Sequence, residues 1–339
     1  MRVLVTGHNG YIGQVLCPML QAAGHEVVGL DTYFYEGCQF QAAPQVESIR
    51  RDIREVTPED LKGIDAVAFL AALSNDALGD LDAGLTEDIN DSGTVRFARM
   101  AKEAGVQRFI FSSSCSLYGA GADMILTEDS AMNPVTPYGK AKIDVELALT
   151  KLADDGFSPS YMRNATAYGL SPSLRIDLVV NNLAGYAVTT GEVLLKSDGT
   201  AWRPLVHVED ISRAFVAVLE APRDAIHDQA FNVGRDEENF QIRQVAEMVH
   251  EAVPGSRVEF AKGAEADTRN YRVSFEKIAR VLPAFQPQWT VRKGADQLVA
   301  AYREHGLTLD ELSSTKYLRI KTILGHKDQG RLDDRLRWV

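Results

Sequence analysis

The stretch Thr6-Gly7-His8-Asn9-Gly10-Tyr11-Ile12-Gly13 decides the fold of this chain. It connects an apolar run, Val3–Thr6, to a segment of helical period, Tyr11–Ala23, and its glycines stand three residues apart. Glycine suits such a turn because the backbone bends sharply and can approach a bound pyrophosphate, while the start of the next helix faces the anion. A glycine-rich turn alone is only a tight loop, but this strand-turn-helix context predicts a dinucleotide-binding fold.

Asp31 stands about 20 residues after the turn, at the end of the second apolar run, where a carboxylate can bind a ribose. It can accept hydrogen bonds from both ribose hydroxyls of NAD, but it would repel a 2′-phosphate. No arginine follows it in Asp31-Thr32-Tyr33-Phe34. We therefore expect the cofactor to be NAD rather than NADP.

Short apolar runs alternate with segments of helical period through the first half of the chain, which is typical of a parallel sheet with crossover helices. The helical segments Tyr11–Ala23 and Glu87–Ala104 each end at a glycine. We expect an α/β fold, a Rossmann-type doubly wound parallel sheet with a smaller C-terminal substrate lobe. The expected strands are Val3–Thr6, Glu26–Leu30, Val46–Ile49, Ala66–Ala71, Arg108–Ser112, Ser160–Met162 and Ala230–Val233.

The alternation weakens from about Ser171, where Pro, Gly and charged residues separate shorter elements. We expect residues 1–170 to form the NAD-binding domain, joined by returning elements at about 205–235, and residues 171–304 to form the substrate-binding lobe. Residues 305–339 follow the last clear core helix and are too apolar for a solvated tail. We expect them to form a helical C-terminal extension that packs against the substrate lobe or a partner subunit.

Composition and charge exclude several classes of function. The formal net charge of -11 argues against a nucleic-acid partner, although a few arginines and helix N-termini can still bind one anionic ligand. Cys17, Cys38 and Cys115 form neither a disulfide framework nor a metal motif, so we expect no metal and a reducing, cytoplasmic location. The first apolar run follows Met1 directly and no apolar segment approaches about 18 residues, so we expect no signal peptide and no membrane span.

Tyr138 and Lys142 stand four residues apart in Pro137-Tyr138-Gly139-Lys140-Ala141-Lys142, after the strand end Ser112-Ser113-Ser114. This spacing places both side chains on one face of a helix. A lysine cation there favours the phenolate and lowers the tyrosine pKa from about 10. Tyr138 is thus a candidate general acid/base, with a serine hydroxyl as hydrogen-bond donor to the reacting oxygen. An exposed Tyr/Lys pair on a solvated helix is the alternative, which the position after the fifth strand disfavours.

Together these motifs resemble the extended short-chain dehydrogenase/reductases, and within them the NAD-dependent sugar-nucleotide epimerase/dehydratase family. The resemblance covers residues 1 to about 304 and also includes Gly93-Thr94 and Tyr118-Gly119. It implies catalytic residues Ser114, Tyr138 and Lys142. It implies that Asp52 and Ile53 flank the adenine, that Leu70, Ala71 and Ala72 line the cofactor, and that Asn90 reaches it. The expected cofactor set is completed by Gly7, Gly10, Tyr11, Ile12, Gly13, Asp31, Thr32, Ser112, Tyr138, Lys142 and Ala165.

The second lobe resembles that of enzymes acting on nucleotide sugars. Asn181-Asn182-Leu183 resembles a segment that meets the substrate diphosphate, and Arg203 lies in an element resembling GxxxRxxxHVxD, where its guanidinium would clamp the diphosphate. His207 and Asp210 of that element are expected to be structural, at the start of a helix. The expected substrate-binding residues are Ser74, Cys115, Ser116, Tyr138, Thr166, Asn182, Leu183, Arg203 and Arg269.

Departures from the family pattern restrict the reaction. Dehydratases of the family carry an Asp-Glu pair after the catalytic hydroxyl, where this chain has Cys115 and Ser116, and 3,5-epimerases place a cysteine at the position of Ser116. Thr166 replaces a usual asparagine, and the arginine expected upstream of Asp267 is absent, so that Arg269, Arg272 or Arg175 can take its place. These residues do not indicate which nucleotide or which sugar the substrate contains.

The best reading is an epimerase acting at C4 of a nucleotide-activated sugar through a transient 4-keto intermediate. The alternative is an NAD-dependent ketoreductase or dehydrogenase, and dehydratase, 3,5-epimerase and non-catalytic NAD-binding protein rank lower. The resemblance also suggests a homodimer through the helices Glu87–Ala104 and Tyr138–Ala153, unless their apolar residues simply face the sheet. Those residues are Val95, Ala98, Ala101, Val145 and Leu149.

Overall fold

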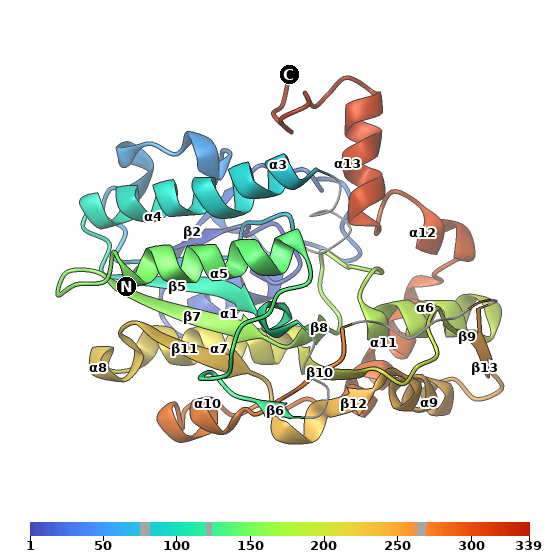
Figure 1. Ribbon diagram of the computed structural model, residues 1–339. Helices are drawn as coiled ribbons and strands as arrows, with labels where there is room; N and C mark the ends of the chain where they lie inside the picture. The colour runs from blue at the N-terminus through green and yellow to red at the C-terminus, as the bar shows by residue number, and fades with distance from the viewer. Residues whose placement is uncertain (75–81, 120–123, 262, 264–268) are drawn as a thin grey trace.

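The computed structural model describes residues 1–74, 82–119, 124–261, 263 and 269–339. Its centre is a seven-stranded parallel sheet in the order β11-β7-β5-β4-β1-β2-β3 (Figure 1). Strand order reverses between β1 and β4, which makes the carboxyl edge there a ligand-binding crevice. The strands are β1 (Arg2–Thr6), β2 (Glu26–Asp31), β3 (Glu47–Arg50), β4 (Ala66–Phe69), β5 (Arg108–Ser114), β7 (Ser158–Asn164) and β11 (Gln229–Val233).

Helices cover both faces of the sheet, because alternate side chains of each strand point to opposite sides. Val3 and Val5 of β1 pack with α1 (Gly13–Ala22) and α7 (Val208–Glu220). Leu4, between them in sequence, packs with α4 (Thr94–Glu103) and α5 (Pro137–Thr150) on the other face. The expected doubly wound sheet is confirmed.

Several strand and helix boundaries differ from the sequence expectation, and two of these differences lie at the cavity. β4 ends at Phe69 rather than Ala71. The N–H of Leu70 is shared between the Thr6 carbonyl at 3.2 Å and the Thr6 hydroxyl at 3.1 Å, and the N–H of Ala71 donates to that hydroxyl at 3.2 Å. The helix expected at Glu87–Ala104 is a continuous run of α3 (Ala83–Thr86), a π-helical segment (Glu87–Gly93) and α4. The π-helical segment carries Asn90 toward the loop after β4.

Shorter elements form a second core. Leu183 of α6, Val245 of α9 and Leu298 of α11 are buried in it. The elements around this core are β8 (Thr166–Tyr168), β10 (Trp202–His207) and β12 (Asn239–Gln241) in one sheet, the pair β9 (Glu192–Leu195) with β13 (Arg257–Phe260), and the helices α6 (Val179–Thr190), α9 (Ile242–Ala252) and α11 (Val291–His305). The pair β6 (Ile125–Leu126) with β14 (Arg272–Val273) and the helices α8 (Arg223–Ile226) and α10 (Glu276–Val281) pack instead in the core of the central sheet. The domain boundaries given above stay predictions.

The C-terminal extension contains α12 (Leu309–Ser313) and α13 (Arg319–Asp328) and then turns back toward the sheet (Figure 1). Leu312 packs on Gly185 of α6, as expected for contact with the substrate lobe. Ile323, Leu332 and Leu336 instead join the core beside Leu30 and Ile53, a contact the sequence did not predict. In the described part of the chain, no helix has both the length and the apolar character needed to cross a bilayer.

Candidate active site

A cavity of about 1000 Å³ opens at the carboxyl ends of the central strands and extends toward α6 and β9. This volume is at the upper end of the usual range for ligand sites. The structure brings nearly all predicted site residues to its wall. They are Gly7, Gly10, Tyr11, Ile12, Gly13, Asp31, Thr32, Asp52, Ile53, Leu70, Ala71, Ala72, Ser74, Ser112, Ser114, Ser116, Tyr138, Lys142, Ala165, Thr166, Asn182, Leu183, Arg203 and Arg269.

The glycine-rich turn leaves bare backbone at the cavity. Gly7 has a φ of 71°, and a Cβ there would lie 3.1 Å from the Ala71 nitrogen. A Cβ on Gly13 would lie 2.4 Å from the Gly7 carbonyl oxygen, closer than real Cβ atoms approach. The turn therefore packs tightly on α1 and β4 and offers main-chain atoms and a helix N-terminus to an anion.

Asp31 is held at the end of β2 by main-chain donors. Its carboxylate accepts from the N–H of Tyr33 at 2.7 Å and from that of Asn9 at 3.0 Å. Burial raises the pKa of this carboxyl, while these two N–H groups, His8 and Arg319 oppose the rise. Asp31 lines the cavity, so a carboxylate with fixed orientation faces the space beyond the glycine turn.

Ser114, Tyr138 and Lys142 meet on one wall. Ser114 ends β5 and its Oγ accepts from the Ser116 N–H at 3.2 Å, while Thr136 caps α5 just before Tyr138. The Lys142 Nζ lies 5.3 Å from the centre of the Tyr138 ring and donates to the Ser112 carbonyl at 2.6 Å. Burial lowers the pKa of Lys142 to about 7, against the opposing charge of Glu146.

A buried ion pair lies behind the catalytic wall. Glu146, one helical turn after Lys142, accepts from the Arg163 guanidinium at 2.7 Å and from the Ser113 hydroxyl at 2.5 Å. Arg163 also donates to the Tyr118 hydroxyl at 3.0 Å. Because these groups occupy the carboxylate of Glu146, this part of α5 is fixed to β5 and β7.

Two predicted site residues do not line the cavity. Asn90 uses its side chain on the backbone of Leu73, accepting from N–H at 2.8 Å and donating to the carbonyl at 3.0 Å, so it shapes the loop after β4. Cys115 is fully buried, its Sγ donates to the Arg163 carbonyl at 3.1 Å, and burial raises its thiol pKa. The 3-10 turn Cys115–Tyr118 directs it into the core rather than toward a substrate.

Arg175, Arg203 and Arg269 line the cavity. Arg175 is buried, pairs with Asp177 and donates to the Ser74 hydroxyl at 3.2 Å. Arg203 is also buried, with its guanidinium carbon 5.5 Å from the centre of the Tyr271 ring. Arg269 lines the cavity, whereas Arg272 lies over the Trp202 ring and does not. Asp267 lies outside the described residues.

His207 and Asp210 follow Arg203 in the sequence and fix the local structure where β10 meets α7. His207 caps α7, accepts from the Glu209 N–H at 3.2 Å and stacks on Trp289, and Asp210 accepts from the N–H groups of Gln288 and Trp289. Both have the structural role expected of them. Asn182 lines the cavity and donates to the Ile176 carbonyl at 3.0 Å.

Sequence reasoning missed four lining residues that close the cavity near Asp31, namely Phe34, Tyr35, Leu318 and Arg319. The first two follow Asp31 directly, and their aromatic character was the signal available. Leu318 and Arg319 come from the C-terminal extension, where no motif pointed to the cavity.

This architecture is that of a dinucleotide-binding α/β enzyme with Ser114, Tyr138 and Lys142 together on one wall of its cavity. The model of the NAD dependent epimerase/dehydratase family matches residues 3–234. The chain belongs to this family, whose members are NAD-dependent and act on nucleotide sugars. The family resemblance and the NAD cofactor expected from the sequence are confirmed.

Three similar proteins illustrate the range of the family. A UDP-glucose 4-epimerase of Corynebacterium glutamicum is 30% identical over 268 residues, 74% of this chain and 80% of that protein. UDP-glucuronic acid decarboxylase 1 of Arabidopsis thaliana is 26% identical over 322 residues, 92% of this chain and 72% of that protein. The solved structure of MoeE5 with UDP-glucuronic acid and NAD has a TM-score of 0.77 at 27% identity, covering 90% of this chain and 99% of MoeE5.

The residues present fit NAD. The turn at Gly7 to Gly13 has no side chain where a pyrophosphate would approach, and Asp31 presents an oriented carboxylate for a ribose. The apolar side chains of Ile53 and Leu70 line the same part of the cavity. No cluster of three or more metal-ligating side chains occurs among the residues that the structure describes.

Proposed function

We propose that this protein is an NAD-dependent epimerase of a nucleotide-activated sugar that acts at C4. The observation that carries the proposal is the wall formed by Ser114, Tyr138 and Lys142 in a chain without the acid pair of a dehydratase. The two positions after Ser114 hold Cys115, buried away from the cavity, and Ser116. This wall can move a proton at one hydroxyl, and it offers no second acid to expel water.

Each residue has a role in that reaction. Bound NAD supplies a reversible acceptor for the C4 hydride. The Tyr138 phenolate takes the proton of the C4 hydroxyl and later returns it, and the Ser114 hydroxyl hydrogen-bonds the same oxygen. Lys142, anchored to the Ser112 carbonyl beside the Tyr138 ring, stabilises the phenolate when its ammonium is charged. After oxidation the keto-sugar turns over, so that the hydride returns to its other face.

The far side of the cavity holds the activating group in this proposal. Arg203 binds the diphosphate with its guanidinium, and Asn182 and Leu183 of α6 lie beside it on the cavity wall. Binding energy from the diphosphate and nucleoside is remote from C4, so it can retain the sugar while the ring rotates. Because the relatives include UDP-glucose 4-epimerases, UDP-sugars are the first substrates to test.

The decisive experiment is product analysis by NMR in D₂O, with NAD⁺ present and a panel of UDP-, GDP-, dTDP- and CDP-sugars. A C4 epimerase returns the hydride it removed, so the product is an isomer without deuterium and NADH absorbance shows no net change. Deuterium at C3 or C5 would indicate 3,5-epimerisation, and loss of water with label at C6 would indicate dehydration. Loss of CO₂ from a uronic acid substrate, or steady change of NADH, would favour decarboxylation or simple oxidoreduction. Any of these four results contradicts the proposal.

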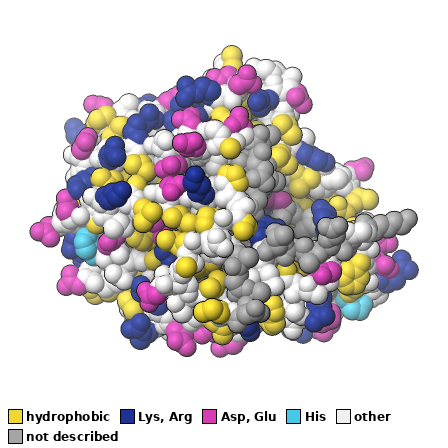
Figure 2. Space-filling view, in the orientation of Figure 1, with side chains coloured by type: hydrophobic (Ala, Val, Ile, Leu, Met, Phe, Trp, Pro, Cys, Tyr) yellow, Lys and Arg dark blue, Asp and Glu magenta, His cyan; other side chains and the backbone are white. Residues whose placement is uncertain are grey.

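We also propose a homodimer, but the residues that support it are not the ones expected from the sequence. Ala98, Ala101, Val145 and Leu149 are fully buried against the sheet, so they are core residues and not an interface. The outer face of α4 and α5 still carries hydrophobic side chains among charged ones (Figure 2), including Leu147, which is 52% exposed. Leu147→Asp should therefore weaken the dimer, and a monomeric wild-type protein in sedimentation would contradict it.

A further inference from the structure

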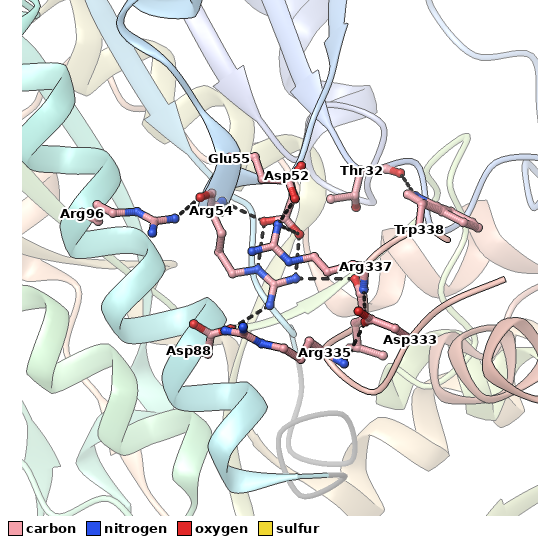
Figure 3. A network of polar contacts seen from close by, with 11 residues as sticks. Thr32, Asp52, Arg54, Glu55, Asp88, Arg96, Asp333, Arg335, Arg337 and Trp338 are labelled. Carbon is pink, nitrogen blue, oxygen red and sulfur yellow. Dashed lines mark hydrogen bonds and ion pairs between the residues drawn. The ribbon is translucent and has the colours of Figure 1, made fainter. Parts of the chain in front are cut away.

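The last residues of the chain lie against Thr32, Asp52 and Glu55 of the N-terminal half (Figure 3). The indole N–H of Trp338 donates to the Thr32 carbonyl at 2.6 Å, directly after Asp31. Arg337 approaches Asp52 to 3.7 Å and also pairs with Glu55. The tail thus binds the loop after β2 and the turn after β3, the two segments expected to hold the ribose and the adenine.

The tail has a defined structure of its own at this point. The Asp333 carboxylate accepts from the N–H of Arg335 at 2.8 Å and from that of Arg337 at 2.7 Å. Leu332 and Leu336 are 4% and 1% exposed and pack in the core with Leu30 and Ile53. Arg337 and Trp338 are therefore presented by a compact loop whose position depends on the NAD-binding half of the molecule.

The adenine-side carboxylate is ordered by a network that the tail completes. Asp52 caps the 3-10 turn Ile53–Glu55 by accepting from the Arg54 N–H at 2.7 Å, and it pairs with the Arg54 guanidinium. Arg54 is itself buried and also pairs with Asp88, which Arg335 of the tail approaches to 3.3 Å. Removal of the tail would take Arg337 away from Asp52 and Arg335 away from Asp88, and it would expose this side of the network.

The start of α13 contributes to the cavity wall directly. Arg319 is 4% exposed and lines the cavity, its guanidinium carbon lies 3.7 Å from the centre of the Tyr35 ring, and one nitrogen donates to the Ser173 hydroxyl at 2.5 Å. Its charge acts on Asp31. A buried cation that lines the same cavity as this carboxylate can attract a ligand that carries a diphosphate next to a ribose.

We propose that the C-terminal segment 318–339 is part of the NAD site, with Arg319 contacting the cofactor and Arg337 and Trp338 acting as positioning residues for its adenosine end. The segment contacts the loop after β2 and the turn after β3, and its residues Leu318 and Arg319 line the cavity. The cofactor is therefore enclosed by residues from both ends of the chain. For an enzyme that reuses one NAD in each cycle, such enclosure slows cofactor loss between turnovers. The inference rests on the placement of NAD proposed above, but on no particular reaction.

Calorimetric titration with NAD⁺ tests the proposal on the full-length protein. Trp338→Ala and Arg337→Ala should each raise the NAD⁺ dissociation constant about tenfold, as expected for loss of one ordering hydrogen bond or charged contact. Arg319→Met, which keeps a side chain over Tyr35, should raise it at least as much. Titration with UDP should give wild-type affinity for the Trp338 and Arg337 variants.

Matched controls separate a cofactor role from a structural one. Arg280→Met and Lys293→Met remove exposed charges on α10 and α11, outside the proposed segment, and both should bind NAD⁺ normally. Melting temperatures are measured with and without saturating NAD⁺, since a weaker site reduces the ligand-induced increase. A tail variant that melts lower but keeps the full NAD⁺-induced increase would show a purely structural role and overturn the proposal.

Asp31→Ala in the same titration tests the placement of NAD independently. If it binds NAD⁺ as tightly as wild type, the placement is wrong and the proposal fails with it. If it binds weakly while the tail variants bind normally, the placement stands and only the role of the tail is refuted. Neither result depends on turnover, so the proposed C4 epimerisation can fail without affecting this test.

Discussion

Replacing Lys142 by methionine should stabilise the NAD-free protein at neutral pH while abolishing turnover. Lys142 is 4% exposed, and burial lowers its pKa from 10.5 to about 7. A shift of this size corresponds to roughly 5 kcal/mol against the charged form. Methionine removes that penalty but leaves the Ser112 carbonyl without the hydrogen bond from Nζ, a loss of about 1–3 kcal/mol. The expected net gain at pH 6.5 is about 2–4 kcal/mol in the free energy of unfolding.

The gain must depend on pH in a defined direction. An unfolded lysine keeps its proton up to about pH 10.5, whereas folded Lys142 releases it above about pH 7. Between these values the unfolded state binds more protons, so the stability of the wild type rises by about 1.4 kcal/mol per pH unit from this group. Lys142→Met lacks that rise. Its advantage should therefore be largest at pH 6.5 and should disappear near pH 9.

Urea unfolding of both NAD-free proteins at pH 6.5, 7.5 and 8.5 measures this difference. Lys140→Met, at an exposed position two residues earlier on the same helix, serves as the control and should leave the pH dependence of the wild type unchanged. A constant free-energy difference between Lys142→Met and the wild type across this range would refute the reasoning. It would mean that Lys142 holds the same proton in the folded and unfolded states.

Three further predictions concern the base, the cofactor and the glycine turn. Tyr138→Phe should bind NAD normally but lose about 10²–10⁴-fold in kcat, and half of the wild-type rate would exclude Tyr138 as the base. The wild type should bind NAD(H) more tightly than NADP(H), and Asp31→Ala should reduce the difference between the two affinities. Equal affinities of the wild type for both cofactors in titration would show that Asp31 does not bind the ribose hydroxyls. Gly13→Ala should lower stability by about 1–3 kcal/mol and weaken NAD binding, because its Cβ would lie 2.4 Å from the Gly7 carbonyl oxygen; unchanged unfolding and titration curves would contradict this.

The sheet could be predicted from the sequence because its central strands are short apolar runs buried on both faces. β1, β2 and β5 each contain the predicted run, and β7 extends Ser160–Met162 by two residues at either end. The boundaries that failed depend on side chains distant in sequence. β4 ends before Leu70 and Ala71, whose N–H groups both donate to the Thr6 hydroxyl, and no periodicity at these two residues records that contact.

The site was predicted well where side chains follow strand ends, since the fold itself brings those positions together. Family resemblance gave the position of Asn90 but not the direction of its side chain, which binds the backbone of Leu73. Cys115, where the chain departs from the family pattern, is packed in the core as a small residue and does not line the cavity. Arg319 could not be predicted, because its place depends on how α12 and α13 return to the sheet. That path is set by tertiary contacts such as Leu312 against Gly185, which leave no local pattern.

The charge of the cavity argues for the kind of ligand it accepts. The chain is acidic overall, with a net charge of -11, yet Arg175, Arg203 and Arg319 are 7%, 6% and 4% exposed at one cavity. Burying a guanidinium is costly unless an anion or hydrogen-bond acceptors compensate it. These arginines come from three separate parts of the chain, so no single local motif requires them to meet. Arg175 pairs with Asp177 and Arg319 donates to Ser173, so these two guanidinium groups already have partners within the protein. Their positive charge at the cavity wall still favours anionic ligands, such as the diphosphates of a dinucleotide and of a nucleotide sugar.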